Sequence, residues 1–304
     1  MKRIILIAII ASLFLISGCA EEQIGKSDQI SIVTTLYPLY EFSKAAGGEK
    51  ADVLLLLPPG TEPHAYDPKP SDIRRIANAD IFVYTGDAME PWAKDILTGI
   101  DNPGLIVIDS SHGLEMRKHE EDHGHGKHDP HIWLDFENDK HIITSIADVL
   151  ALKDSENKAY YNQNADDYVA KLDELDYKFS SGLADCEHNE FITGGHSAFS
   201  YLAQRYGLEQ ISVFGLSPDA EPTPKRIVEM TELAKEKGFN YIFFEELVNP
   251  KTAQVIADEV GAETLMINPA ASLTKEQMEK GYTFISVMEN NLENLRVGLG
   301  CKVK

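Results

Sequence analysis

The chain has 304 residues, of which 43% are hydrophobic and 25% charged, and its formal net charge is -21. A soluble chain of this length usually folds into two domains. An acidic surface repels the phosphate backbone, so the charge argues against nucleic acid as a partner and weakly favours cations.

The amino terminus resembles a bacterial lipoprotein signal. A basic start and a short apolar run precede Ile16-Ser17-Gly18-Cys19, a sequence similar to a lipobox. A transmembrane anchor is the alternative, but the run is shorter than the roughly 20 residues that a membrane span needs. We therefore expect residues 1–19 to form the signal peptide, Cys19 to carry lipid and residues 20–29 to form a polar tether. The protein would then be anchored to the outer face of the cytoplasmic membrane.

Strand and helix patterns alternate through both halves of the chain. Short apolar runs predict strands at 30–36, 53–57, 81–85, 105–109, 191–193, 211–214, 241–244 and 264–267. Helical spacing predicts helices at 40–46, 72–77, 197–206, 224–237 and 252–260. This order predicts an α/β fold with two similar lobes, each with a small parallel sheet flanked by helices.

One long amphipathic helix is predicted between the two halves. Apolar residues step by three and four through a stretch that contains neither Gly nor Pro from residue 155 to residue 181: Tyr161, Ala165, Tyr168, Leu172, Leu175, Phe179 and Leu183. At about 1.5 Å per residue such a helix spans roughly 40 Å. An ordinary core helix is the alternative. We interpret residues 154–185 as a rigid linker between lobes at 30–153 and 186–304.

The end of the chain predicts a last helix and a disulfide. The sequence Thr274-Lys275-Glu276-Gln277 fits a capping box, and apolar residues continue on one side to Leu299. With Cys19 assigned to lipid, Cys186 and Cys301 remain, and an exported compartment permits them to pair. Two free thiols are the alternative.

Six of the ten histidines lie between His112 and His131. A flexible run of His, Asp, Glu and Gly can chelate a borderline cation, although a solvated polar loop has the same composition. We expect the histidine-rich loop, residues 112–130, to supply additional weaker metal sites from four of its residues: His119, His123, His125 and His128.

Three histidines lie where ligands of an open α/β sheet bind. His64 follows a predicted strand, His131 follows the histidine-rich run, and His196 lies between a predicted strand and helix. Their shared position favours a metal site over three unrelated histidines. We interpret His141, on a helix face, and His188, in a polar loop, as bystanders.

Several longer segments resemble one family. The segments PHAYDPKPSDI, DPHIWLD, HSAFSYLAQRYGL, VFGLSPDAEPTPKRI and FFEELVNPKTAQVIADEVGAETLMINP are similar to those of zinc-binding, substrate-binding lipoproteins of ABC-type metal uptake systems, the ZnuA-like cluster A-I family. The resemblance implies two lobes joined by a rigid helix, with His64, His131 and His196 as ligands of one Zn²⁺. It further implies zinc as cargo for an ABC permease. Histidine at position 196 is typical of zinc members, whereas manganese members tend to carry a carboxylate there.

The sequence departs from the family pattern at the position of the fourth ligand. Many relatives supply Asp or Glu in the loop after the last strand, whereas this chain has Asn268 and Ala271 there. Zinc takes four ligands, so water or a group from the histidine-rich loop could complete the site. Nearby side chains are candidates for a fourth ligand or for partners that orient the histidines: Asn268, Glu245, Glu246 and Glu62.

The sequence thus predicts a monomeric carrier that captures Zn²⁺ outside the cytoplasm and is not an enzyme. A manganese-binding homologue and a metal-dependent adhesin are the alternatives. A zinc hydrolase is a further one, because three histidines and an open position also hold catalytic zinc. The chain carries no paired catalytic acid or nucleophile motif that would favour it.

Overall fold

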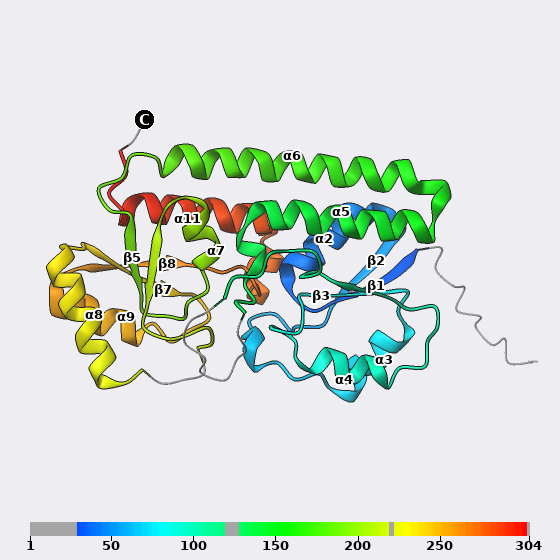
Figure 1. Cartoon of the computed structure of the whole chain (residues 1–304), viewed down its shortest axis with the longest axis horizontal. Coiled ribbons are helices and arrows are strands. Elements are labelled where there is room, and N and C mark those ends of the chain that lie inside the picture. The colour runs from blue at the N-terminus through cyan, green and yellow to red at the C-terminus, as the bar shows by residue number, and fades with distance from the viewer. Residues whose placement is uncertain (1–28, 119–127, 219–221, 303–304) are drawn as a thin grey trace, which may run out of the picture.

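The computed structural model describes residues 29–118, 128–218 and 222–302 (Figure 1). Several sequence-based expectations lie outside the described residues: the signal peptide, the lipid on Cys19, nearly all of the tether, and His119, His123 and His125. Within the described ranges, every helix is too short or too polar to cross a membrane.

The first lobe is built on a four-stranded parallel sheet in the order β2-β1-β3-β4. Its strands are β1 (Ile30–Thr34), β2 (Ala51–Leu55), β3 (Ile81–Tyr84) and β4 (Ile106–Asp109). Every residue of β3 is buried, as expected for a central strand covered on both faces. Ile81 and Val83 join the core with α2 (Tyr37–Gly47) and α5 (Phe136–Lys153), whereas Phe82 and Tyr84 pack on the side of α3 (Pro70–Asn78) and α4 (Trp92–Thr98).

The second lobe repeats this topology with the order β6-β5-β7-β8. Its strands are β5 (Glu190–Thr193), β6 (Glu209–Ser212), β7 (Tyr241–Glu245) and β8 (Glu263–Ile267). Helices α8 (Pro224–Lys237) and α9 (Lys251–Val260) share one core cluster with Ile192 and Ile242. Phe191 and Phe243 belong to the other cluster, with α7 (Ser200–Arg205) and α11 (Phe284–Gly298). The predicted fold class is confirmed.

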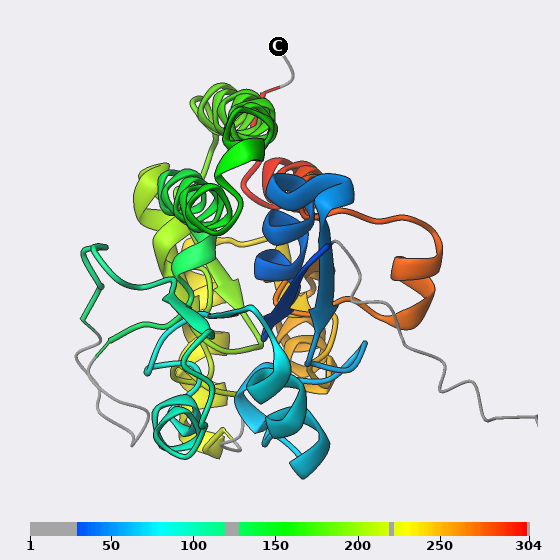
Figure 2. The same ribbon diagram turned by 90° about the vertical axis from the view of Figure 1, so that its right-hand side faces the viewer.

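Helix α6 (Lys158–Gly182) runs along both lobes. The first six apolar positions of its predicted stripe are the buried residues of the helix: Tyr161, Ala165, Tyr168, Leu172, Leu175 and Phe179. Helix α6 packs against α5 and α2 at one end and against α11 at the other (Figures 1 and 2). Its 25 residues correspond to about 38 Å. A short 3₁₀ turn, Ser155–Asn157, precedes it, so the helix starts slightly later than predicted.

The prediction of one continuous last helix was wrong. The chain forms α10 (Lys275–Glu279) and then α11, which begins after a second capping box between Thr283 and Ser286. Gly281, with φ of 74°, turns the chain in the left-handed region that glycine adopts without steric cost. The sequence patterns predict no range for helices α4 and α5, although they place His141 on a helix face.

A disulfide joins the end of the second lobe to its beginning. The bond links Cys186, which lies before β5, to Cys301, which follows α11, across 115 residues. It ties the carboxyl-terminal helix to the segment that enters the second sheet.

Candidate metal centre

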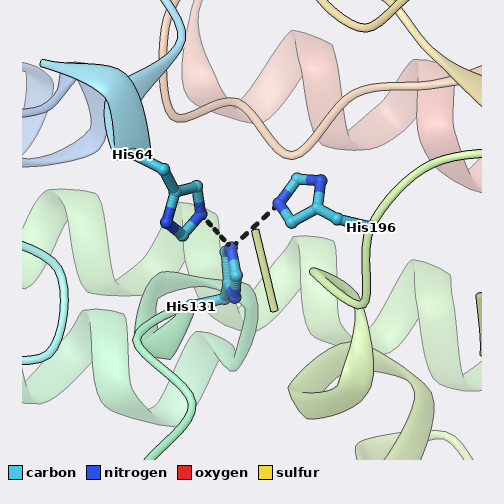
Figure 3. Close-up of side chains that lie close together, drawn as sticks. All are labelled: His64, His131 and His196. Carbon is cyan, nitrogen blue, oxygen red and sulfur yellow. Dashed lines mark hydrogen bonds between the residues drawn. The ribbon is translucent and has the colours of Figure 1, made fainter. Parts of the chain in front are cut away.

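Three histidines from the two lobes meet at one point (Figure 3). His64 lies in the 3₁₀ turn Pro63–Ala65 after β2, and His131 directly precedes the 3₁₀ turn Ile132–Leu134. His196 lies in the loop between β5 and α7, on the other lobe. The Nε2 atom of His131 lies 3.2 Å from that of His64 and 3.1 Å from that of His196.

These separations suit a tetrahedral zinc ion. With Zn–N bonds of about 2.05 Å, two ligand nitrogens of a tetrahedron lie about 3.3 Å apart. The three histidines each offer a ring nitrogen, and all three of these atoms lie within 4.8 Å of one another. Two histidines are buried and the third is half-buried. The group can therefore hold a metal ion with little rearrangement.

Carboxylates orient two of the three rings. The Nδ1 atom of His131 lies 2.7 Å from Oδ1 of Asp129, which also accepts the backbone N–H of His131. The Nδ1 atom of His196 lies 2.8 Å from Oε2 of Glu245, whose Oε1 accepts the backbone N–H of His196. If each Nδ1–H donates a hydrogen bond to its carboxylate, each Nε2 carries a lone pair.

The resulting arrangement favours a bound cation. In those tautomers the Nε2 atoms of His131 and His196 point two lone pairs at each other across 3.1 Å, which is repulsive unless positive charge lies between them. A metal ion satisfies all the Nε2 atoms at once. Asp129 and Glu245 thus place the donors where an ion would be bound.

The two buried rings have opposite pKa shifts. Burial lowers the pKa of His131, and the charge of Asp129 offsets this only in part. Burial alone would also lower the pKa of His196, but its contact with Glu245 prevails and raises that pKa. Burial acts to raise the pKa of Asp129, yet its contacts with His131 and Ser200 hold it below its usual value. His131 is therefore readily neutral, whereas zinc must displace a more firmly held proton from His196.

The pocket around the histidines is mainly apolar. Its lining includes Met89, Trp133, Leu247, Val248, Pro269 and Ala271, together with Glu62, Asn268 and Ser272. Trp133 donates its indole N–H to the carbonyl of Pro269 at 2.7 Å, which fixes a loop of the second lobe against the first. Apolar walls exclude water and strengthen the electrostatic interactions within the site.

The candidates for the fourth position differ in availability. The Oδ1 atom of Asn268 accepts the N–H of Ala270, whose φ of 57° is left-handed, and its Nδ2 donates to Glu246. The side chain of Asn268 therefore shapes the loop. Glu62 lines the pocket and accepts the backbone N–H of His64 at 3.2 Å. Ala271 lines the pocket without a donor atom.

The remaining histidines of the described part of the chain stay apart from this group. His128 is exposed and its backbone pairs with Lys118. His141 contacts the carbonyl of His112, and the ring of His188 packs on Phe239.

Sequence reasoning missed two residues of the site. Asp129 lies two positions before His131 within DPHIWLD, and a carboxylate that close to a ligand histidine is a usable signal for an orienting partner. The hydroxyl of Ser200 donates to the second oxygen of Asp129. No local pattern marks Ser200, because the contact joins residues 71 positions apart.

Two parallel-sheet lobes bridged by one helix, with histidines from both lobes at their junction, define a two-lobed binding protein for a metal ion. The profile of the family "Zinc-uptake complex component A periplasmic" (ZnuA) matches residues 32–298. The chain belongs to this family.

Individual relatives are similar over nearly the whole chain. The zinc-binding lipoprotein AdcA of Streptococcus pneumoniae R6 is 38% identical over 97% of this chain. The match spans 61% of the length of that relative. The high-affinity zinc uptake system protein ZnuA of Bacillus subtilis 168 is 36% identical, and 97% of each protein is covered.

Solved structures agree with these sequence similarities. The Zn(II)-bound ZnuA-like domain of S. pneumoniae AdcA superimposes with a TM-score of 0.78 at 38% identity and covers 89% of this chain and 99% of that one. The laminin-binding protein Lmb of Streptococcus agalactiae, described as having adhesin and metal-transporting activity, gives a TM-score of 0.80 at 30% identity. Its match covers 89% of this chain and 99% of Lmb.

Proposed function

We propose that this protein captures Zn²⁺ outside the cytoplasm between its two lobes and delivers it to an ABC permease. The observation that carries the proposal is the convergence of three Nε2 atoms, two of them on histidines oriented by buried carboxylates. The zinc-bound AdcA domain and the zinc uptake protein of B. subtilis support zinc as the cargo. The protein would bind and release its ion without chemical change.

His64, His131 and His196 are the proposed ligands of the ion. Water or Glu62 would complete the tetrahedron, because both require no change in the loop around Asn268. Three neutral imidazoles suit Zn²⁺, whereas Mn²⁺ prefers oxygen ligands and more of them. Glu245 would orient His196 and thereby raise its basicity as a ligand.

The organisation around the site is proposed as the sequence predicts it. Residues 30–153 and 186–304 would form the lobes, with residues 154–185 as their link. A lipid on Cys19 would hold the monomeric protein at the membrane beside its permease. The histidine-rich loop would bind further zinc more weakly, because ordering a flexible segment costs conformational entropy.

Replacement of single histidines tests the ligand assignment. His64→Ala, His131→Ala and His196→Ala should each lower zinc affinity by orders of magnitude, because each removes one of three protein ligands. His141→Ala, an exposed histidine outside the group, is the matched control. Affinities would be measured by competition with a chelator, using protein stripped of metal. A ligand variant that binds zinc like the parent would remove that residue from the site.

Adhesion is a second candidate function, favoured by the similarity to Lmb. Binding of the purified protein to immobilised laminin, with and without zinc, would test it. The His131→Ala variant shows whether adhesion depends on the metal site, because adhesion through another surface would survive the loss of zinc. Absence of laminin binding in both conditions would exclude laminin as a partner of this protein.

A further inference from the structure

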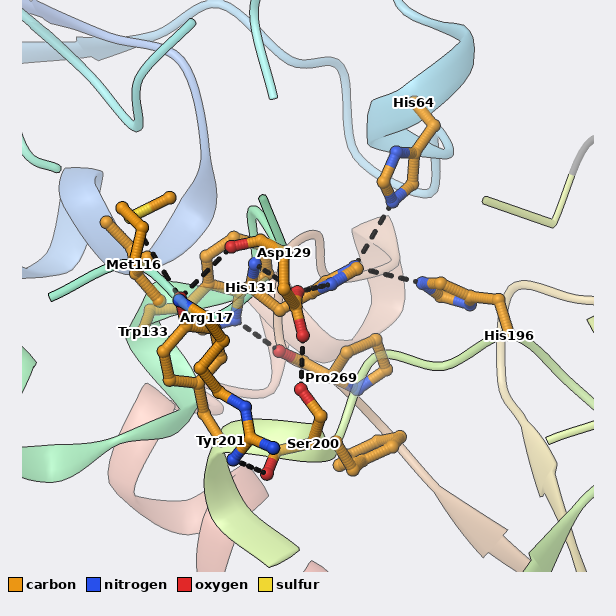
Figure 4. A network of polar contacts seen from close by, with 12 residues as sticks. His64, Met116, Arg117, Asp129, His131, Trp133, His196, Ser200, Tyr201 and Pro269 are labelled. Carbon is orange, nitrogen blue, oxygen red and sulfur yellow. Dashed lines mark hydrogen bonds and ion pairs between the residues drawn. The ribbon is translucent and has the colours of Figure 1, made fainter. Parts of the chain in front are cut away.

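The two carboxylates that orient the histidines are anchored differently. Glu245 lies at the end of β7, in the same lobe as His196, so this pair does not depend on the other lobe. Asp129 belongs with His131 to the first lobe, but its Oδ2 accepts the hydroxyl of Ser200 from α7 of the second lobe (Figure 4). One carboxylate of the N-terminal lobe thus contacts a metal ligand through one oxygen and the opposite lobe through the other.

The next residue of α7 reinforces the contact. The hydroxyl of Tyr201 accepts the backbone N–H of Arg117 at 3.0 Å and donates to the backbone carbonyl of Asp129 at 3.1 Å. The backbone N–H of Asp129 in turn donates to the carbonyl of Arg117 at 2.9 Å. Arg117 also donates through Nη1 to the carbonyl of Ser200 at 2.8 Å. Tyr201 therefore joins Arg117 and Asp129, two residues of the histidine-rich loop, to α7.

Burial prevents water from replacing these contacts. Asp129 is 2% exposed and Tyr201 is 4% exposed, so neither group can exchange its partner for bulk water while the lobes are together. A buried carboxylate that loses one partner pays a desolvation cost and shifts toward new partners. The position of Asp129, and with it the ring of His131, therefore depends on α7.

We propose that Ser200 and Tyr201 are positioning residues that hold His131 in its metal-binding orientation only while the two lobes are in contact. This inference rests on the proposed binding of zinc by the three histidines. When the lobes separate, His196 keeps Glu245, whereas Asp129 loses the hydroxyls of both residues. His131 is then the first ligand to lose its fixed orientation. Separation of the lobes thereby weakens metal binding and promotes release of the ion.

Variants of Ser200 and Tyr201, the clamp residues, test this coupling. Ser200→Ala removes one hydroxyl and Tyr201→Phe removes the other while keeping the ring in the core. Ser200→Thr keeps a hydroxyl and should restore the parent behaviour. Ser181→Ala, which removes an exposed hydroxyl on α6, is the matched control. All variants are made in the full exported chain.

Three readouts separate positioning from simple stability. Zinc release into excess chelator should accelerate about tenfold in Ser200→Ala and Tyr201→Phe, at the lower end of the range for partners that orient metal ligands. The absorption bands of bound Co²⁺, which report ligand geometry, should shift in these two variants and return in Ser200→Thr. The melting temperature of the metal-free protein should fall only modestly, because each variant leaves a buried polar group without one partner, and this fall should not account for the faster release.

Parent-like release rates and Co²⁺ spectra in both clamp variants would overturn the proposal. It would equally be overturned if release accelerates only in proportion to a lower melting temperature, with the Co²⁺ bands unchanged, since α7 would then serve stability alone. A parent protein that binds no zinc would refute the proposed function, and the clamp with it.

Discussion

Glu90 is expected to make the stability of this protein depend on pH near neutrality. Its side chain is 3% exposed and lies in the loop after β3. It accepts the hydroxyl of Thr35, which follows β1, at 2.5 Å, and the backbone N–H groups of Thr85 and Gly86, each at 3.1 Å. Burial raises the pKa of Glu90 from 4.5 to about 7, against the opposing effect of these donors.

The sign follows from where the proton is held. The folded state binds the proton of Glu90 more tightly than the unfolded state. The stability that this proton adds to the fold is therefore fully present below pH 4.5 and is lost as pH rises through about 7. This rise in the pKa of Glu90 corresponds to about 3 kcal/mol of stability at low pH. Glu90→Gln imitates the protonated carboxyl, because its amide can donate to Thr35 while its oxygen accepts the backbone N–H groups.

Urea denaturation of metal-free protein at pH 5 and pH 8 tests this reasoning. The free energy of unfolding of Glu90→Gln, relative to the parent, should rise by about 2.5 kcal/mol between these conditions, because a small part of the effect is already lost at pH 5. Glu259→Gln, at an exposed position on α9, serves as the control and should show no such change. An equal pH dependence in the parent and in Glu90→Gln would show that Glu90 ionises normally in the fold.

Three further results are expected. Replacing Cys186 and Cys301 by Ser should lower the free energy of unfolding by about 4 kcal/mol, since the closed loop spans 115 residues; an unchanged urea midpoint would contradict this. Zinc affinity should fall as pH decreases through the raised pKa of His196, because protons compete for its ring, whereas constant affinity between pH 8 and pH 5 would argue against histidine ligands. Ala271→Glu should improve manganese binding relative to zinc in competition titrations, because Ala271 lines the pocket. Asn268→Asp should not, because that side chain accepts a hydrogen bond from the loop backbone. The opposite order of the two variants would refute this assignment.

The fold was predictable because its signals are local. Buried parallel strands appear as short apolar runs, and the stripe from Tyr161 to Phe179 appears as one helical period, so the α/β class with its long helix is confirmed. The split of the last helix was not anticipated. A capping box at Thr283 and the left-handed turn at Gly281 outweigh an apolar pattern that continues across both.

The site was predictable only in part. The three histidines could be selected by their place near strand ends and by family resemblance, and their convergence in the structure agrees with that selection. Their assignment as ligands stays a prediction. The contact from Ser200 to Asp129 depends on how two lobes meet, which no spacing within either segment encodes.

The packing of α6 on both lobes restricts how the site can open. A single helix that contacts α5 and α2 at one end and α11 at the other resists a large hinge motion between the lobes, whereas flexible connecting strands would permit one. The accessible motion is then a small sliding of packed side chains along this helix, the shear type of domain movement. Distances between labels on the outer ends of the lobes should change little between loaded and empty protein, and the energetic cost of opening should lie in repacking the surface buried against α6.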